Sequence, residues 1–157
     1  MDAVGLEVLM RELAADCAVL AAATDNAAQW IVQPEAGRLE ACAYEMNRFY
    51  TVFERMLERI CESFENHFEK SGNYHERLLQ RLALDLPGLR PAFLPTEVLP
   101  ELSELRRFRH LVRHAYDLKL RTDRLGELVG SAKRMSTALP GWCAGFAAAV
   151  RREQGWL

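Results

Sequence analysis

The residues best suited to chemistry stand together in one stretch of eleven, RRFRHLVRHAY, at positions 106–116. The stretch contains four arginines, two histidines and a tyrosine. Guanidinium groups bind phosphates through charge-assisted hydrogen bonds, so four of them can hold a phosphate backbone. Imidazoles exchange protons near neutral pH, which suits general acid–base catalysis. The stretch therefore predicts a site that binds an anion and transfers protons beside it.

The apolar and polar residues of this stretch separate onto two faces if it is helical. At about 100° per residue, an apolar face turns toward a core and a polar face toward solvent. The predicted core face holds Leu105, Phe108, Leu111, Val112, Ala115 and Leu118. The polar face holds Arg106, His110, Arg113, His114 and Asp117, with Arg109 and Tyr116 at the margin of the core face.

The direction of Arg109 differs from that of His114 by about 140° on such a helix. His110 and His114 are four residues apart and are expected to stack one turn above the other. One straight helix cannot direct both Arg109 and His114 at the same small group. Either Arg109 reaches round the helix, or a second copy of the helix completes the site across a dimer axis.

Two other interpretations of the cluster stay open. Arg106, Arg107 and Arg113 can form a solvated face that pairs with Glu101, Glu104 and Asp117. The two histidines have the HxxxH spacing of a helical zinc site, but the glutamate of HExxH is missing and the arginines disfavour a cation. We therefore expect no metal, and the absence of GxxxxGK[ST], GxGxxG and GxSxG motifs predicts no nucleotide cofactor or serine nucleophile.

The composition is that of an ordinary globular chain with an uneven charge distribution. The 157 residues carry a net charge of −2. Residues 1–100 hold 9 Lys and Arg against 16 Asp and Glu, a net of −7, whereas residues 101–157 hold 11 against 6, a net of +5. A basic patch on an acidic body suits a local anionic ligand. No apolar run approaches the roughly 18 residues of a membrane span, and no export signal is present, so we expect a cytoplasmic protein without membrane contact. The four cysteines form no Cys-x-x-Cys motif and are expected to be free thiols.

The elements that must position this cluster are helices. Apolar residues recur at steps of three and four, whereas no strand alternation of useful length occurs, so the fold is expected to be all-α, an up-down helical bundle. The expected helices span 4–32, 35–68, 74–85, 96–120 and 124–156, with Thr96 and Thr122-Asp123 as caps and an interruption at Pro140-Gly141. One domain of 1–157 is predicted, in which 1–33 adds an N-terminal helix. Long Phe- and Met-rich stripes favour a homodimer.

A family resemblance adds to these inferences. The segment RHLVRHAY, residues 109–116, fits R-[polar]-x-x-x-H-x-Y and resembles the signature of HEPN-domain proteins, in particular the HepT-like toxins. The context is similar too, because the signature follows the long amphipathic segment EMNRFYTVFERMLERI at 45–60. The resemblance covers the chain from about residue 34, through the run ELRRFRHLVRHAYDL at 104–118.

The resemblance implies a metal-independent endoribonuclease that acts as a homodimer with one composite cleft. Arg109 would hold the scissile phosphate, His114 would be the general acid or base, and His110 would support the site. Arg106, Arg107 and Arg113 would bind RNA. Tyr116 would be modified with AMP by a partner nucleotidyltransferase antitoxin of the MNT type, which would block RNA by charge and bulk.

The chain departs from the family pattern at one position, because His110 stands where Asn or Asp is more typical. Some HEPN proteins bind RNA or nucleotides without cutting, so a noncatalytic binding module is an alternative function. A helical adaptor whose cluster is only a charged surface is another.

Overall fold

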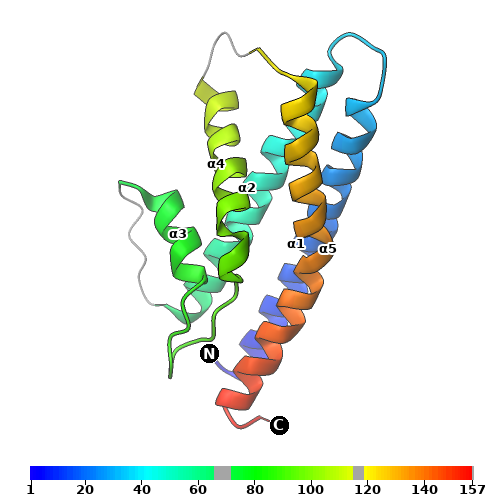
Figure 1. The fold of residues 1–157 in the computed structure, drawn as a ribbon. Helices are drawn as coiled ribbons and strands as arrows, with labels where there is room; N and C mark the ends of the chain where they lie inside the picture. Colours follow the sequence, from blue (N-terminus) through cyan, green and yellow to red (C-terminus); the bar gives the residue numbers. More distant parts are fainter. Residues whose placement is uncertain (66–71, 115–118, 157) are drawn as a thin grey trace.

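The computed structural model describes residues 1–65, 72–114 and 119–156, and these form an all-helical protein. Its helices are α1 (Ala3–Ile31), α2 (Arg38–Phe64), α3 (Tyr74–Leu82), α4 (Leu99–His114) and α5 (Thr122–Glu153), with a 3-10 turn, η1, at Thr96–Val98. Within the described ranges the only β-type pairing is one isolated bridge between Leu86 and Arg90. The predicted all-α class is confirmed, and the four longer helices run alternately up and down (Figure 1).

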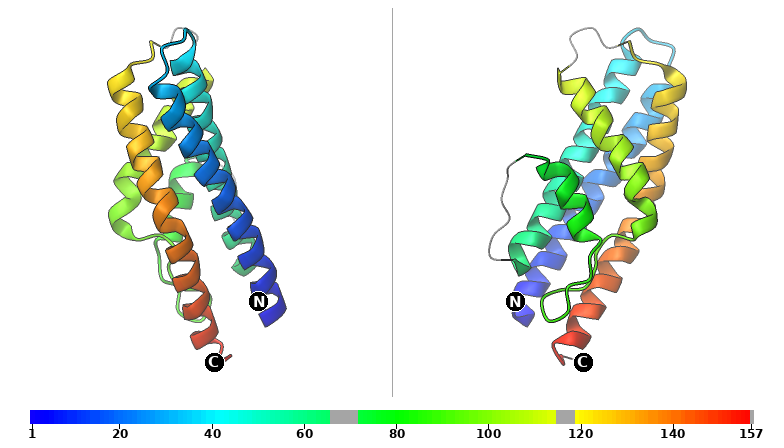
Figure 2. Two further views of the ribbon diagram at one scale, coloured as in Figure 1. Left: turned by 90° about the vertical axis from the view of Figure 1, so that its right-hand side faces the viewer. Right: turned by 60° about the vertical axis from the view of Figure 1, so that its left-hand side comes forward.

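The core is formed by the apolar stripes of α1, α2 and α5, which pack along one another. Figure 2 shows α3 and α4 on one side of this trio, where they pack against α2. The apolar α1 residues that are at most 2% exposed recur at helical spacing: Leu6, Leu9, Leu13, Leu20, Ala23 and Ala27. Each fully buried leucine contributes roughly 1.5–3 kcal/mol, so these stripes fix how the helices pack.

The start of α2 differs from the predicted one. The helix was expected to begin at residue 35, but α2 begins at Arg38. Gly37 precedes it with a φ of 83°, a left-handed conformation that glycine adopts without steric cost. The Arg38 guanidinium then donates to the Ile31 carbonyl at 2.6 Å and to the Thr122 hydroxyl at 3.2 Å, which ties the α1–α2 connection to α5.

The helix α5 is continuous, so the predicted interruption at Pro140-Gly141 is wrong. Pro140 removes one backbone N–H, yet Leu139 and Cys143 on either side of it are buried against the core and hold the helix together. The predicted cap is wrong as well, because Thr122 is already helical. Asp123 lies in the first turn, where its carboxylate accepts from Arg121 at 2.5 Å and 3.1 Å.

The connection between α3 and α4 is held by Arg90, whose side chain is 0% exposed. Its Nε donates to Glu65 Oε1 at 2.9 Å, and its Nη2 donates to the Arg81 carbonyl at 2.9 Å. Glu65 also accepts from the Arg81 side chain. The connection is thereby fixed against the end of α2, which sets where α4 begins.

The predicted cap of α4 is also wrong. Thr96 is the first residue of η1 instead, with Pro95 at its N-cap, and the Thr96 hydroxyl contacts the Glu97 carboxylate at 3.2 Å. None of the helices in the described ranges is both long and apolar enough to span a bilayer.

Candidate functional site

The helix α4 carries the described part of the Arg/His cluster along the outer side of α2. Leu105 is 1% exposed and Phe108 and Val112 are partly buried, as predicted for the core face. Leu111 is 49% exposed, so its assignment to the core is wrong. The reason is that α4 packs at the edge of the bundle and buries a narrower stripe than the wheel suggests. Ala115, Tyr116, Asp117 and Leu118 lie outside the described residues.

Arg109 is directed toward α2 and is held there by several groups. Its Nε donates to the Thr51 hydroxyl at 3.2 Å, and its Nη1 lies 3.6 Å from Glu54 Oε1. The guanidinium carbon lies 5.8 Å from the centroid of the Tyr50 ring, which is cation–π range. The Arg109 side chain is only 12% exposed. The contacts to Thr51 and Glu54 are made by Nε and Nη1 of the guanidinium.

The two histidines stack on the other side of α4. The ring centroids of His110 and His114 lie 4.5 Å apart with 45° between the ring planes, as their spacing predicts. Both residues are exposed in the last turns of the helix. Arg109 does not reach round the helix toward them, because Thr51 and Glu54 hold it against α2. One chain therefore does not bring Arg109 and His114 to the same point.

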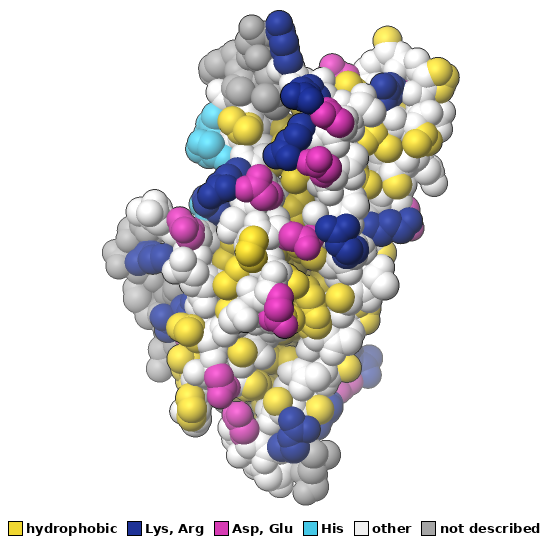
Figure 3. All heavy atoms as spheres, viewed as in Figure 1, with side chains coloured by type: hydrophobic (Ala, Val, Ile, Leu, Met, Phe, Trp, Pro, Cys, Tyr) yellow, Lys and Arg dark blue, Asp and Glu magenta, His cyan; other side chains and the backbone are white. Residues whose placement is uncertain are grey.

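The other arginines of the cluster have different surroundings. Arg107 pairs with Glu104 at 2.6 Å, which agrees with the solvated-face interpretation. Arg106 instead approaches Glu76 of α3 at 3.9 Å, and its Nε is buried without a hydrogen-bond partner. Arg113 is exposed and forms no ion pair with the described residues. Figure 3 shows acidic side chains between the Lys and Arg side chains on this face, so the predicted basic patch is mixed in charge.

A buried carboxylate beside Arg109 was missed by sequence reasoning. Glu54 is only 7% exposed. Its Oε2 lies 2.5 Å from Nδ1 of His75. A signal was present, because Glu54 follows the core residue Phe53 and lies one turn after Tyr50, at the border of the apolar stripe.

The polar cluster under Arg109 keeps its tyrosines neutral. Burial, reinforced by the charge of Glu54, raises the pKa of Tyr50, while Arg106 and Arg109 oppose the shift. Burial and a 2.5 Å hydrogen bond to Glu58 raise the pKa of Tyr74. A neutral phenol ring presents its negative face to Arg109 without adding a second anion to Glu54.

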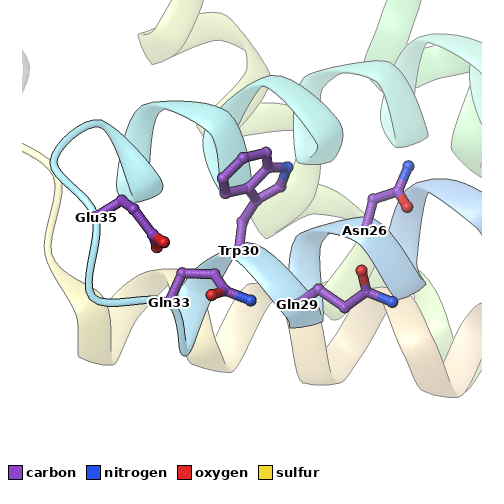
Figure 4. A pocket seen from close by; sticks show the side chains of 5 residues that line it. All are labelled: Asn26, Gln29, Trp30, Gln33 and Glu35. Carbon is purple, nitrogen blue, oxygen red and sulfur yellow. The ribbon is translucent and has the colours of Figure 1, made fainter.

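Two surface pockets lie away from Arg109. One of about 280 Å³ lies between α4 and α5. Its lining combines the apolar side chains of Phe108, Leu111, Leu120, Leu125 and Leu128 with the charged side chains of Glu104, Arg107, Lys119, Arg121 and Arg124. The other, of about 480 Å³, is an open hollow near the end of α1, where Trp30 lies among the amides of Asn26, Gln29 and Gln33 (Figure 4).

A metal-binding arrangement does not occur in the part of the chain that the structure describes. No three His, Cys, Asp or Glu side chains gather there as ligands do. The four cysteines are free thiols, as expected, and three of them are buried.

The comparison with protein families identifies the chain. No curated protein and no solved structure matched it. The family model of HepT-like proteins matches residues 41–150, from the first turns of α2 to near the end of α5, and this range contains Arg109 and His114. The chain therefore belongs to the HepT-like protein family.

Proposed function

We propose that this protein is a HepT-like toxin that cleaves RNA without a metal ion. Family membership supports the assignment. The structural observation that supports it most is the position of Arg109. A guanidinium fixed by Thr51 and backed by Tyr50 needs little reorganisation when it binds a phosphate. A preorganised cation of this kind stabilises the charge that develops on phosphate oxygens in the transition state.

The proposed reaction is transphosphorylation by the ribose 2′-OH. The 2′ oxygen forms a bond to phosphorus while the bond from phosphorus to the 5′ oxygen breaks. One group accepts the 2′ proton and another supplies a proton to the 5′ oxygen, leaving a cyclic 2′,3′-phosphate and a 5′-hydroxyl. Arg109 holds the phosphate, His114 acts as general acid or base, and His110, stacked on it, supports the site.

The proposed site is shared between two copies of the chain. Arg109 points toward α2 while His114 lies on the exposed side of α4, so a second copy of α4 supplies the missing partner. The exposed Leu111 between them is suited to such an interface, since it is half exposed in one chain. RNA would lie along Arg106, Arg107 and Arg113. Modification of Tyr116 with AMP by an MNT-type nucleotidyltransferase antitoxin would place a negative charge in the cleft and exclude RNA.

The decisive experiment is induction of the wild-type chain without any antitoxin, with growth and total RNA followed together. Wild type is expected to arrest growth and to fragment RNA, whereas His114→Ala and Arg109→Ala do neither. Arg152→Ala, an exposed change near the end of α5, is the matched control and should behave as wild type. Harmless expression of wild type with intact RNA would contradict the nuclease. Tyr116→Phe should stay toxic when the antitoxin is supplied.

A noncatalytic RNA- or nucleotide-binding module is the second candidate. The observation in its favour is that Arg109 is only 12% exposed and already close to a carboxylate. Such a module would bind RNA with equal affinity in wild type and His114→Ala and would cut it in neither. A filter-binding measurement beside the cleavage assay separates the two functions.

A further inference from the structure

We propose that His75 is the general base of the cleavage reaction and that Glu54 orients it. His75 lies outside the Arg/His cluster, on the short helix α3. The assignment rests on the proposed function, because it names the group that takes the proton from the 2′-OH.

The contacts of Glu54 place His75 beside the phosphate-binding arginine. One carboxylate oxygen of Glu54 lies 3.6 Å from Arg109 Nη1, and the other lies 2.5 Å from His75 Nδ1. The imidazole is thus separated from the guanidinium by a single carboxylate. A phosphate bound by Arg109 would bring the adjoining ribose to the same side of the bundle, where α3 and α4 contact each other.

The carboxylate determines how the imidazole is protonated. An ionised Glu54 can only accept, so Nδ1 of His75 carries the proton and Nε2 keeps its lone pair. The Glu54 side chain is 9% exposed and the His75 side chain is 47% exposed, so the buried end is fixed while the ring remains open to solvent. The imidazole lies between Glu54 from α2, with Arg109 from α4 behind it, and the Tyr74 ring, whose centroid is 5.3 Å from that of His75. This is the geometry of a carboxylate–histidine pair that abstracts a proton from a hydroxyl.

The pairing of Glu54 with His75 also indicates which histidine accepts a proton and which donates one. Transphosphorylation needs one group that accepts the 2′ proton and one that donates a proton to the departing 5′ oxygen. Glu54 holds His75 at Nδ1 while the ring is 47% exposed, so we assign proton acceptance to His75. His114 contacts the ring of His110 and no carboxylate of the described residues, so the donor role falls to His114. In the composite site, His75 then comes from the same copy as its neighbouring Arg109, and His114 comes from the other.

The test is cleavage of an RNA oligonucleotide by the purified full-length chain, with His75→Gln, Glu54→Gln, His114→Ala and the α3 surface control Gln80→Ala. Glutamine at position 75 can still donate to Glu54, so α3 stays in place, which an unchanged melting temperature verifies. His75→Gln is expected to lose about 10²- to 10⁴-fold in kcat. It should also lose the acidic limb of the pH–rate profile. Glu54→Gln should lower kcat as well, because an amide fixes the imidazole less firmly than a carboxylate does.

A second substrate separates base from acid. Replacing the 5′ oxygen of the scissile linkage by sulfur gives a leaving group that departs without protonation. His114→Ala should regain most of its activity on this substrate, whereas His75→Gln should stay slow. If His75→Gln cleaves RNA at the wild-type rate, or if the sulfur substrate restores its activity, His75 is not the general base. The proposed ribonuclease activity would be unaffected by that result. If wild type itself does not cleave RNA, both the nuclease and its base are refuted.

Discussion

At the scale of single residues, Arg109 depends on geometry as much as on charge. A lysine keeps the charge but cannot donate to Thr51 and face Tyr50 while presenting a further donor, since its ammonium is a single point. Arg109→Lys is therefore expected to lower kcat by about 10²- to 10³-fold. The measurement is RNA cleavage by purified protein, with Arg134→Lys on the exposed side of α5 as control. Full activity of Arg109→Lys would show that Arg109 acts only through its charge.

The buried thiols make the fold sensitive to alkali. Burial raises the pKa of Cys42 to about 11 and that of Cys61 to about 12, from the ordinary value of 9.0. The unfolded chain ionises these thiols above pH 9 while the folded chain does not, so stability is complete below pH 9 and falls as pH rises toward 11–12. Urea unfolding at pH 8 and pH 10 should show the decrease. Cys61→Ala should reduce the pH dependence, even though the cavity lowers stability at both pH values.

At the scale of elements, Pro140 shows a helix that packing maintains against local preference. Pro140 is exposed, so replacing it leaves no cavity, and alanine restores a backbone donor inside α5. Pro140→Ala is expected to increase the free energy of unfolding by about 1–3 kcal/mol. Urea denaturation measures this directly. No gain would mean that α5 is deformed around the proline in a way that alanine does not relieve.

The helices could be predicted because their buried residues recur every three or four positions, as Leu6, Leu9 and Leu13 do in α1. Two of the errors in the expected helices lie next to prolines. Pro34 and Pro140 both disfavour a helix interior, yet Pro34 lies in a loop and Pro140 lies inside α5. The difference comes from the neighbours: Arg38 joins the first site to α5, while buried side chains surround the second. Contacts between distant segments determine the local structure at both prolines, and the spacing of residues along the chain does not reveal these contacts.

In the candidate site, too, the arrangement within one helix could be predicted from the sequence, but the contacts between helices could not. The spacing of Arg109, His110 and His114 identified the helix and the stacked histidines. Glu54 and His75 could not be paired, because 21 positions separate them and they meet only when α3 docks on α2. A carboxylate is buried only if distant donors satisfy it, and sequence periodicity assigns it to solvent by default.

At the scale of the whole molecule, a shared site predicts complementation between inactive chains. In a mixed dimer of Arg109→Ala and His114→Ala, one site loses both groups and the other keeps both. Equal mixing after dissociation should restore about a quarter of wild-type activity if the dimer is two-fold symmetric. Mixing His75→Gln with His114→Ala should restore activity likewise, whereas His75→Gln with Arg109→Ala should not. Absence of recovery in every mixture would contradict a site made from two copies.

The matched family range and the physical core have different limits. The HepT-like match begins at residue 41, yet α1 ends before it and lies along both α2 and α5. Arg59 of α2 reaches Glu12 and Asp16 of α1, each at 3.2 Å, which adds polar contacts to the apolar ones. The N-terminal helix is therefore part of the core that supports the site, although the family signature lies elsewhere.

The buried Arg90 also has a consequence for how the molecule opens. The Arg90 guanidinium can be buried only when Glu65 and the Arg81 carbonyl are both in place to accept from it. We therefore expect the end of α2, the end of α3 and the following connection to separate together. The amides of Phe93 and Leu94 both donate to the Leu82 carbonyl, at 2.8 Å and 2.9 Å, across this junction. In native-state hydrogen exchange these two amides should share one opening free energy with those of α3, as one cooperative unit. Arg90→Met should lower the protection of all of them at once while leaving the amides of α1 nearly unchanged.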